Sequence, residues 1–497
     1  MPQPVISAEQ YSLLVRERIA ALRQLRLGLI RGAPQSAPHR FFDSIRILIG
    51  AIEKVFTNRS EDIKSQSISE VEKDNKIAFA ARLTLKLLND VQEQLFPFLE
   101  KLGSPHVPLA VLPAMQRIAS EFETDVELYL FPASEHNFGF SGFRNLTRTF
   151  IQKFELIIPD DLKAEIQKEA EKLPSWFVFL SFPYVVHDSA LHLTPLLHEL
   201  GHFADFERGI YKELLPIDVS GIEAADKLVD KICQMPLSQQ GPKAESSQEP
   251  SVEARVGQIL QREVIAQQVF AQCSEVIHSW VHELISDLFA LRMVGPAYFY
   301  AFATFAGTVG LEAKAEKTHP SPAIRIDFMV KELKELGYFS EDSSEQVRSS
   351  LKGWENWIQT QKLEPEDDIA LVAHLAMKEN ATKLANAVRK HSPQFSYEAE
   401  TFVAKVPCVT ADLDAGIPPI DRPSVHKGVL EPCGFADILN GAWTTYMFSP
   451  ERLESLLDCR VEERKLRAVS VLNELVLKAI EASEILRRCQ KPPEAKA

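Results

Sequence analysis

The sequence predicts a mainly α-helical protein with a small β-sheet, that is, an α+β fold. Apolar residues recur at helical spacing through most of the 497 residues. Trp176–Phe182 departs from this pattern, because it is an aromatic and β-branched run bounded by prolines, which is typical of a strand. The hydrophobic share of 45% and the charged share of 25% are those of an ordinary globular protein, long enough for roughly two or three domains.

Residues 1–130 are predicted to form an N-terminal helical region. They contain no obvious catalytic cluster, and we expect this region to cover a functional site or to bind a partner. The polar residues 57–76 predict a loop between two of its helices. The predicted helices span residues 8–31, 40–56, 77–102 and 109–130.

Residues 131–340 are predicted to form a central domain. Thr194 and Pro195 are suited to be the N-cap and the first residue of a helix. Residues 234–252 are rich in proline, glycine and serine, which predicts a flexible surface insert. The other expected elements are a loop at 132–146, a helix from Pro159 to about Leu173, the strand at 176–182 and a long helix at 252–293.

Residues 341–497 are predicted to form a C-terminal helical region. Helical patterns continue to about Lys390 and return at 434–447 and 450–488. The proline-rich residues 405–432 between them predict irregular structure.

Composition and charge narrow the class of protein. The net charge of −14 argues against nucleic acid or an anionic membrane as the main partner. Val294–Leu311 runs 18 residues without a charge, but its glycines, proline and threonines favour a buried core helix over a membrane span. The six cysteines form no CxxC pair and are predicted to be reduced, and the first residues show no secretory pattern. We therefore predict a cytoplasmic protein, whose oligomeric state the sequence does not determine.

The main candidate site is the motif His198-Glu199-Leu-Gly-His202. Helical residues four apart share one face, so the two imidazoles can bind one metal ion. Glu199 is placed to take a proton from a water on that ion. Neighbouring leucines and phenylalanines make the helix apolar on nearly all sides, and buried histidines beside a glutamate need a partner. The motif therefore predicts a zinc site.

A second cluster, His282-Glu283-Leu-Ile-Ser-Asp287, supplies a candidate third ligand. Its helix is otherwise apolar, so Glu283 and Asp287 are expected to be buried and either paired or metal-bound. The spacing allows Glu283 to bind zinc while Asp287 hydrogen-bonds a ligand histidine. His278 and His282 are also four apart, but His282 points about 100° away from Glu283. We interpret these two as packing histidines.

The two clusters together resemble a known family. HExxH with a distant Glu-x-x-x-Asp resembles the gluzincin class of metallopeptidases, and Glu283-Leu-Ile-Ser-Asp287 is similar to an element of thermolysin-like enzymes. The wide gap between the motifs, and His319-Pro followed by Arg325, resemble the HtpX and CAAX-prenyl-protease group. The resemblance covers roughly residues 175–337 and implies a zincin-like catalytic core flanked by helical regions. It implies that His319 stabilises the oxyanion and that Arg325 organises the site.

The resemblance implies a zinc metallopeptidase that hydrolyses a protein or peptide substrate. Glu199 is then expected to pass a proton from water to the leaving amine. Tyr298 and Tyr300 are further hydrogen-bond donors, interpreted mainly as core residues. The strand at 176–182 is either a substrate-binding sheet edge or a buried strand. The implied zinc ligands are His198, His202 and Glu283, with Asp287 beside them.

Alternatives stay open. Glu223 is an earlier candidate for the third ligand, although no aspartate follows it at the required spacing. The metzincin alternative fails, because its pattern needs glycine and histidine where this chain has Asp205 and Arg208. The membrane helices of the HtpX group are not expected here, so a membrane or prenylated substrate is not implied. The rival function is a non-catalytic or latent regulatory protein with structural zinc in a gluzincin core and helical flanks that bind a partner.

Overall fold

The computed structural model is mainly helical, with one three-stranded mixed sheet and one two-stranded sheet in the described residues, which confirms the predicted fold class. The chain divides into two compact units, Met1–Asp188 and Ser189–Ala497. The predicted three-region division stays a prediction. The structure describes residues 7–32, 39–102, 108–134, 137–144, 174–234, 252–311, 313–423, 430–457 and 460–490.

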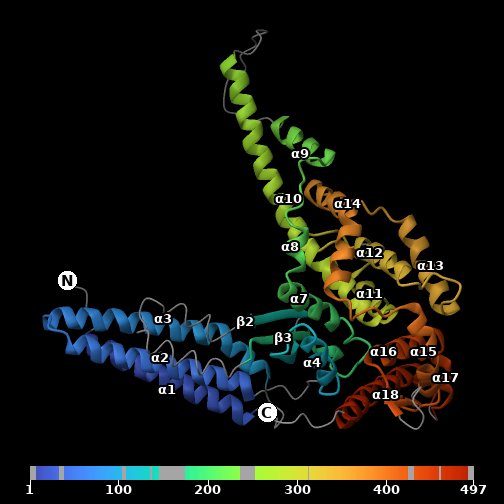
Figure 1. The fold of residues 1–497 in the computed structure, drawn as a ribbon, viewed down its shortest axis with the longest axis horizontal. Coiled ribbons are helices and arrows are strands. Elements are labelled where there is room, and N and C mark those ends of the chain that lie inside the picture. Colours follow the sequence, from blue (N-terminus) through green and yellow to red (C-terminus); the bar gives the residue numbers. More distant parts are fainter. Residues whose placement is uncertain are drawn as a thin grey trace. The chain divides into compact units, whose positions relative to one another are not determined.

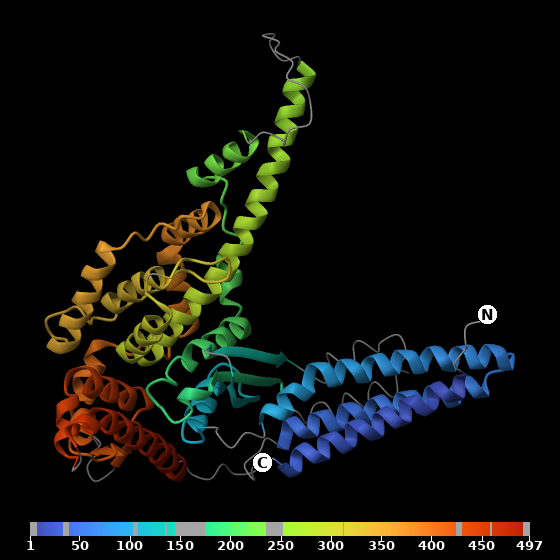
Figure 2. The ribbon, with the colours of Figure 1, turned by 180° about the vertical axis from the view of Figure 1, so that it is seen from behind.

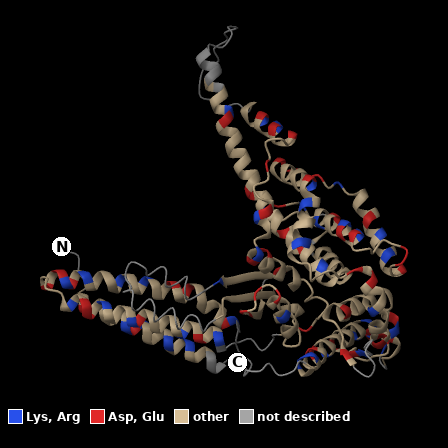
Figure 3. Ribbon diagram, viewed as in Figure 1, with Lys and Arg blue, Asp and Glu red and all other residues tan. Residues whose placement is uncertain are grey.

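The first unit contains three long helices that run side by side: α1 (Ala8–Gly32), α2 (His39–Ser65) and α3 (Glu70–Leu102) (Figure 1). The loop predicted at 57–76 is wrong over most of its length, because α2 and α3 extend into it. Its polar residues lie on exposed helix faces, and the buried Ile63 keeps the apolar spacing. Figure 3 shows acidic and basic residues interspersed along all three helices.

A short helix and the main sheet complete this unit. The strand predicted at 176–182 is confirmed, but residues 126–130 are strand rather than helix and 139–144 are strand rather than loop. The partner strands are far apart in sequence, so local periodicity could not predict their pairing. The elements are α4 (Leu112–Ser120), β1 (Val126–Ala133), β2 (Gly139–Arg144), β3 (Trp176–Pro183) and the 3-10 helix η1 (Tyr184–Val186).

Strand β3 lies in the middle of the sheet. It pairs with β1 in parallel and with β2 antiparallel, in the order β1-β3-β2. Its side chains are nearly all buried, and Phe177 and Phe179 pack against Phe41 of α2 with ring centroids 5.3 and 4.8 Å apart. Of the two alternatives left open for this strand, the structure shows the buried strand, because both of its edges are already paired.

The second unit is organised around α10 (Val252–Val294), which α7 (Leu196–Arg208), α9 (Glu223–Gln234), α12 (Pro322–Glu335) and α14 (Asp368–His391) all contact. Figure 2 shows this arrangement from behind. The predicted long helix at 252–293 is confirmed. The remaining elements are α8 (Ile210–Leu214), α11 (Pro296–Val309), α13 (Glu345–Thr360), α15 (Ala399–Asp414), β4 (Asp421–Pro423), β5 (Leu430–Pro432), α16 (Phe435–Phe448), α17 (Pro450–Ser455) and α18 (Val461–Gln490).

Two predictions for this unit have clear outcomes. The uncharged run from Val294 forms the largely buried helix α11, and none of the described helices carries an apolar stretch long enough to cross a bilayer. The irregular structure predicted from residue 405 is wrong up to Asp414, because α15 continues through Pro407. The helix expected after Pro159 and most of the insert at 234–252 lie outside the described residues.

Candidate metal centre

The site is built where α7 crosses α10. A Cβ at Gly201 would lie 2.6 Å from the Ser286 Cα, so only glycine permits this approach of the two helices. Helix α7 begins at Leu196, with Pro195 as its N-cap, one residue later than predicted. It ends at Arg208, and its C-cap Gly209 has a φ of 63°, in the left-handed region that favours glycine.

The close packing brings both histidines of the HExxH motif to Glu283. The Nε2 atom of His198 lies 3.3 Å from Oε2 of Glu283, and Nε2 of His202 lies 3.4 Å from Oε1. One ligand atom from each residue lies within 4.8 Å of the others. Nitrogen ligands about 2.0–2.1 Å from a tetrahedral ion stand about 3.3 Å apart, so these three residues can hold a metal ion. Glu223 is exposed and pairs with Lys227 instead.

The other ring nitrogen of each histidine has a partner on α10. His198 Nδ1 lies 2.9 Å from Oδ1 of Asp287, as predicted, and His202 Nδ1 lies 3.0 Å from Oγ of Ser286. These contacts orient both rings and leave each Nε2 directed at Glu283. This contact of Ser286 was not predicted from the sequence. Its position three residues after Glu283, on the same helix face, could have indicated it.

Arg325 on α12 binds the acids behind the histidines. Its guanidinium donates to both carboxylate oxygens of Asp287, at 2.6 and 2.7 Å, and lies 3.3 Å from Oε2 of Glu283. It packs over the ring of Phe302, with 4.5 Å from Cζ to the centroid. The buried Tyr298 hydroxyl donates to the same aspartate at 2.5 Å. Arg325 therefore positions Asp287 and Glu283, which is an organising role.

The two remaining candidates, His319 and Tyr300, differ in their distance from the site. His319 is half exposed, with Nε2 3.6 Å from Oε1 of Glu283 and Nδ1 2.9 Å from Oγ1 of Thr318. It precedes α12, whose N-cap Ser321 accepts from the Ile324 amide. Tyr300, by contrast, is buried against Trp443 and other aromatic rings. The structure thus brings His319 to the site and leaves Tyr300 in the core.

Electrostatics distinguish the acids of the site. Burial raises the pKa of Glu199, which is 7% exposed. Burial opposes ionisation of Asp287 as well, but Arg325 outweighs it and lowers the pKa of Asp287 to about 2. For Glu283, hydrogen bonds from the histidines and the charge of Arg325 outweigh burial and hold the pKa well below its usual range. Three buried acids thus face one arginine, an excess that a divalent cation would compensate.

His278 and His282, predicted to be packing histidines, also make polar contacts, and their Nε2 atoms lie 3.3 Å apart. His282 Nδ1 lies 2.5 Å from Oδ2 of the buried Asp205, and its ring stacks on Phe206. Asp205, the residue that excludes the metzincin pattern, therefore pairs with His282 on α10.

Comparisons with known proteins give no relative. No protein-family profile matches the chain, and neither curated proteins nor solved structures provide a match. The interpretation of the site therefore depends on its own geometry.

Proposed function

We propose that this protein is a zinc-dependent metallopeptidase of the gluzincin kind. The observation that carries the proposal is the buried group of His198, His202 and Glu283 with Glu199 beside it. Zinc suits two imidazoles and a carboxylate, and three protein ligands leave a position for water and substrate. Bound there, zinc would supply Lewis acidity that activates water and polarises a carbonyl.

The protein's own groups divide the remaining work. Glu199 takes the proton of the attacking water and gives it to the leaving amine, and its raised pKa suits a group that must hold and release a proton. His319, half exposed at the site, donates a hydrogen bond to the oxygen that gains charge. Asp287 and Arg325 keep His198 in one tautomer and orientation.

The experiment compares wild type with Glu199→Gln. Peptide hydrolysis is measured on a random peptide library by mass spectrometry, and bound zinc by elemental analysis. We expect stoichiometric zinc in both proteins and a loss of about 10²–10⁴-fold in rate for the variant. Glu207→Gln, the same change farther along α7, is the control and should stay active. A folded wild type without zinc, or equal rates for Glu199→Gln and wild type, contradicts the proposal.

One observation favours a second candidate, a regulatory protein with structural zinc. His319 Nε2 lies 3.6 Å from Oε1 of Glu283, close enough for His319 to become a fourth ligand, and structural zinc sites are closed. His319→Gln separates the two functions. In a peptidase the variant keeps its zinc and loses rate, whereas in a closed structural site it loses zinc affinity.

A further inference from the structure

A second pair of histidines on α10 repeats the geometry of the HExxH pair. The Nε2 atoms of His278 and His282 lie 3.3 Å apart. Their ring centroids are 4.6 Å apart at an interplanar angle of 82°, compared with 4.7 Å and 84° for His198 and His202. Two imidazole nitrogens about 3.3 Å apart have the separation of neighbouring ligands on a tetrahedral ion.

The second pair also has a carboxylate behind it. Oδ2 of Asp205 lies 2.5 Å from Nδ1 of His282, and this aspartate is fully buried on α7. A carboxylate at Nδ1 favours the proton on that nitrogen, which leaves the lone pair of a neutral ring on Nε2. Asp287 stands in the same relation to His198 in the first site. Asp205 accepts from the Tyr211 amide at 2.9 Å as well, which holds its carboxylate in place.

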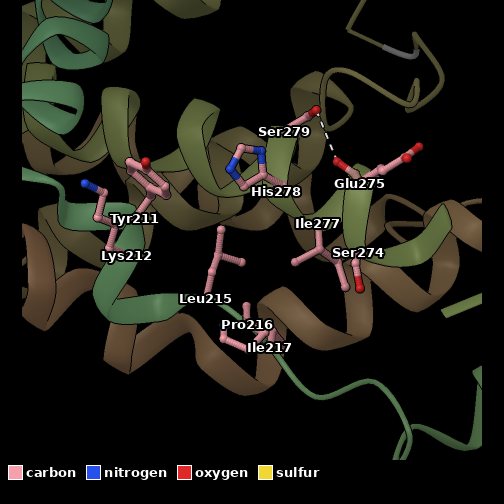
Figure 4. Close-up of a pocket in the computed structure, with 10 residues that line it drawn as sticks. All are labelled: Tyr211, Lys212, Leu215, Pro216, Ile217, Ser274, Glu275, Ile277, His278 and Ser279. Atoms are coloured by element: carbon pink, nitrogen blue, oxygen red, sulfur yellow. Dashed lines mark hydrogen bonds between the residues drawn. The ribbon is translucent and has the colours of Figure 1, made fainter. Parts of the chain in front are cut away.

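Of this pair, His278 is open to solvent, whereas the His282 side chain is 12% exposed. His278 is exposed and lines a cavity of about 720 Å³ between α8 and α10. Figure 4 shows its imidazole beside the ring of Tyr211, with Glu275 and Ser279 farther along the same helix. An ion can therefore approach the pair from the side of His278.

We propose that His278 and His282 bind a second divalent transition-metal ion, with Asp205 orienting His282. Imidazole ligands suit zinc, copper and nickel. Two protein ligands hold an ion less tightly than the three at Glu283, so this site is the weaker of the two. The proposal does not depend on peptidase activity.

The test is equilibrium dialysis of the full chain against Zn²⁺, with bound zinc counted by elemental analysis. Wild type should bind two ions, one tight and one weak. His278→Gln should keep the tight ion and lose the weak one, with an affinity reduced at least ~10-fold. His391→Gln is the matched control, because His391 also bonds a carboxylate, that of Glu213 at 2.6 Å, and this variant should bind two ions.

Two more variants locate the effect. His202→Gln should weaken the tight site and leave the weak ion bound, so a failure of the peptidase proposal is distinguishable from a failure of this one. Asp205→Asn should weaken the second ion by about 10–100-fold, as expected when a carboxylate that orients a ligand is removed. A His278→Gln variant that binds as much zinc as wild type, with the same affinities, overturns the proposal.

Discussion

Two clusters of charged side chains lie against helix α10, and they differ in how their charges are balanced. At its C-terminal end, Arg292 contacts Glu332 at 2.7 Å, and Arg389 contacts the same glutamate at 2.8 Å and Glu335 at 3.7 Å. Two arginines thus face two glutamates, and the cluster is neutral within the protein. Two turns earlier, the acids of the metal centre have one arginine between them.

This difference in charge balance is what we expect between a structural network and a candidate binding site. Buried charges are stable when they are paired, and removing one partner of a buried pair is costly. The network at Glu332 is complete without any added ion. The centre at Glu283 has more acids than arginines among its described contacts, an imbalance that a bound cation would compensate. Burial by itself would lower the pKa of His198, but hydrogen bonds to Asp287 and Glu283 raise it to about 10.

The largest expected effect comes from breaking the neutral cluster. Glu332→Gln leaves the buried Arg292 without its anion, and we expect the free energy of unfolding to decrease by about 3–5 kcal/mol. The decrease, measured in urea, should be the same with excess zinc and with a chelator. Glu335→Gln is the control on the same helix, because Glu335 is 65% exposed and its pair should contribute about 0–1 kcal/mol. Equal losses for the two variants would show that the network is not structural.

The corresponding change from acid to amide at the candidate metal centre should reduce zinc affinity. Asp287→Asn removes the carboxylate that orients His198, and we expect zinc affinity to fall about 10–100-fold. Competition with a chromophoric chelator measures this affinity. Glu332→Gln should leave zinc affinity unchanged, because Glu332 contacts Arg292 and Arg389 and not the histidines. Normal zinc affinity in Asp287→Asn would place Asp287 outside the metal centre.

The smallest expected effect, counted for a change of one pH unit, is a dependence of zinc affinity on pH. A metal ion binds only neutral imidazole, so below the pKa of His198, about 10, binding must release its proton. Apparent affinity should therefore decrease by about tenfold for each unit that the pH falls below this value. Calorimetry in two buffers of different ionisation enthalpy counts the protons released. Asp287→Asn should release fewer, because it removes one of the groups that raise this pKa, and no release by wild type contradicts the assignment.

Sequence reasoning was strongest where spacing along one helix decides which side chains share a face. His198 with His202, and Glu283 with Asp287, are each four residues apart, and the structure brings both pairs to one place. It was weakest where a contact joins distant segments. The hydrogen bond between Asp205 and His282 depends on how α7 crosses α10. Gly201 permits this crossing, but a glycine in the sequence does not predict it.

The sequence by itself determined the class of fold, the apolar helices and the placement of His198 and His202 on one helix face, because these follow from local periodicity. Tertiary structure alone decided that β3 is a central strand, that Ser286 orients His202 and that Arg325 binds Asp287. It also placed the second histidine pair beside a buried carboxylate. Pairing partners and hydrogen bonds between helices depend on long-range packing, to which the spacing of residues within one element is insensitive.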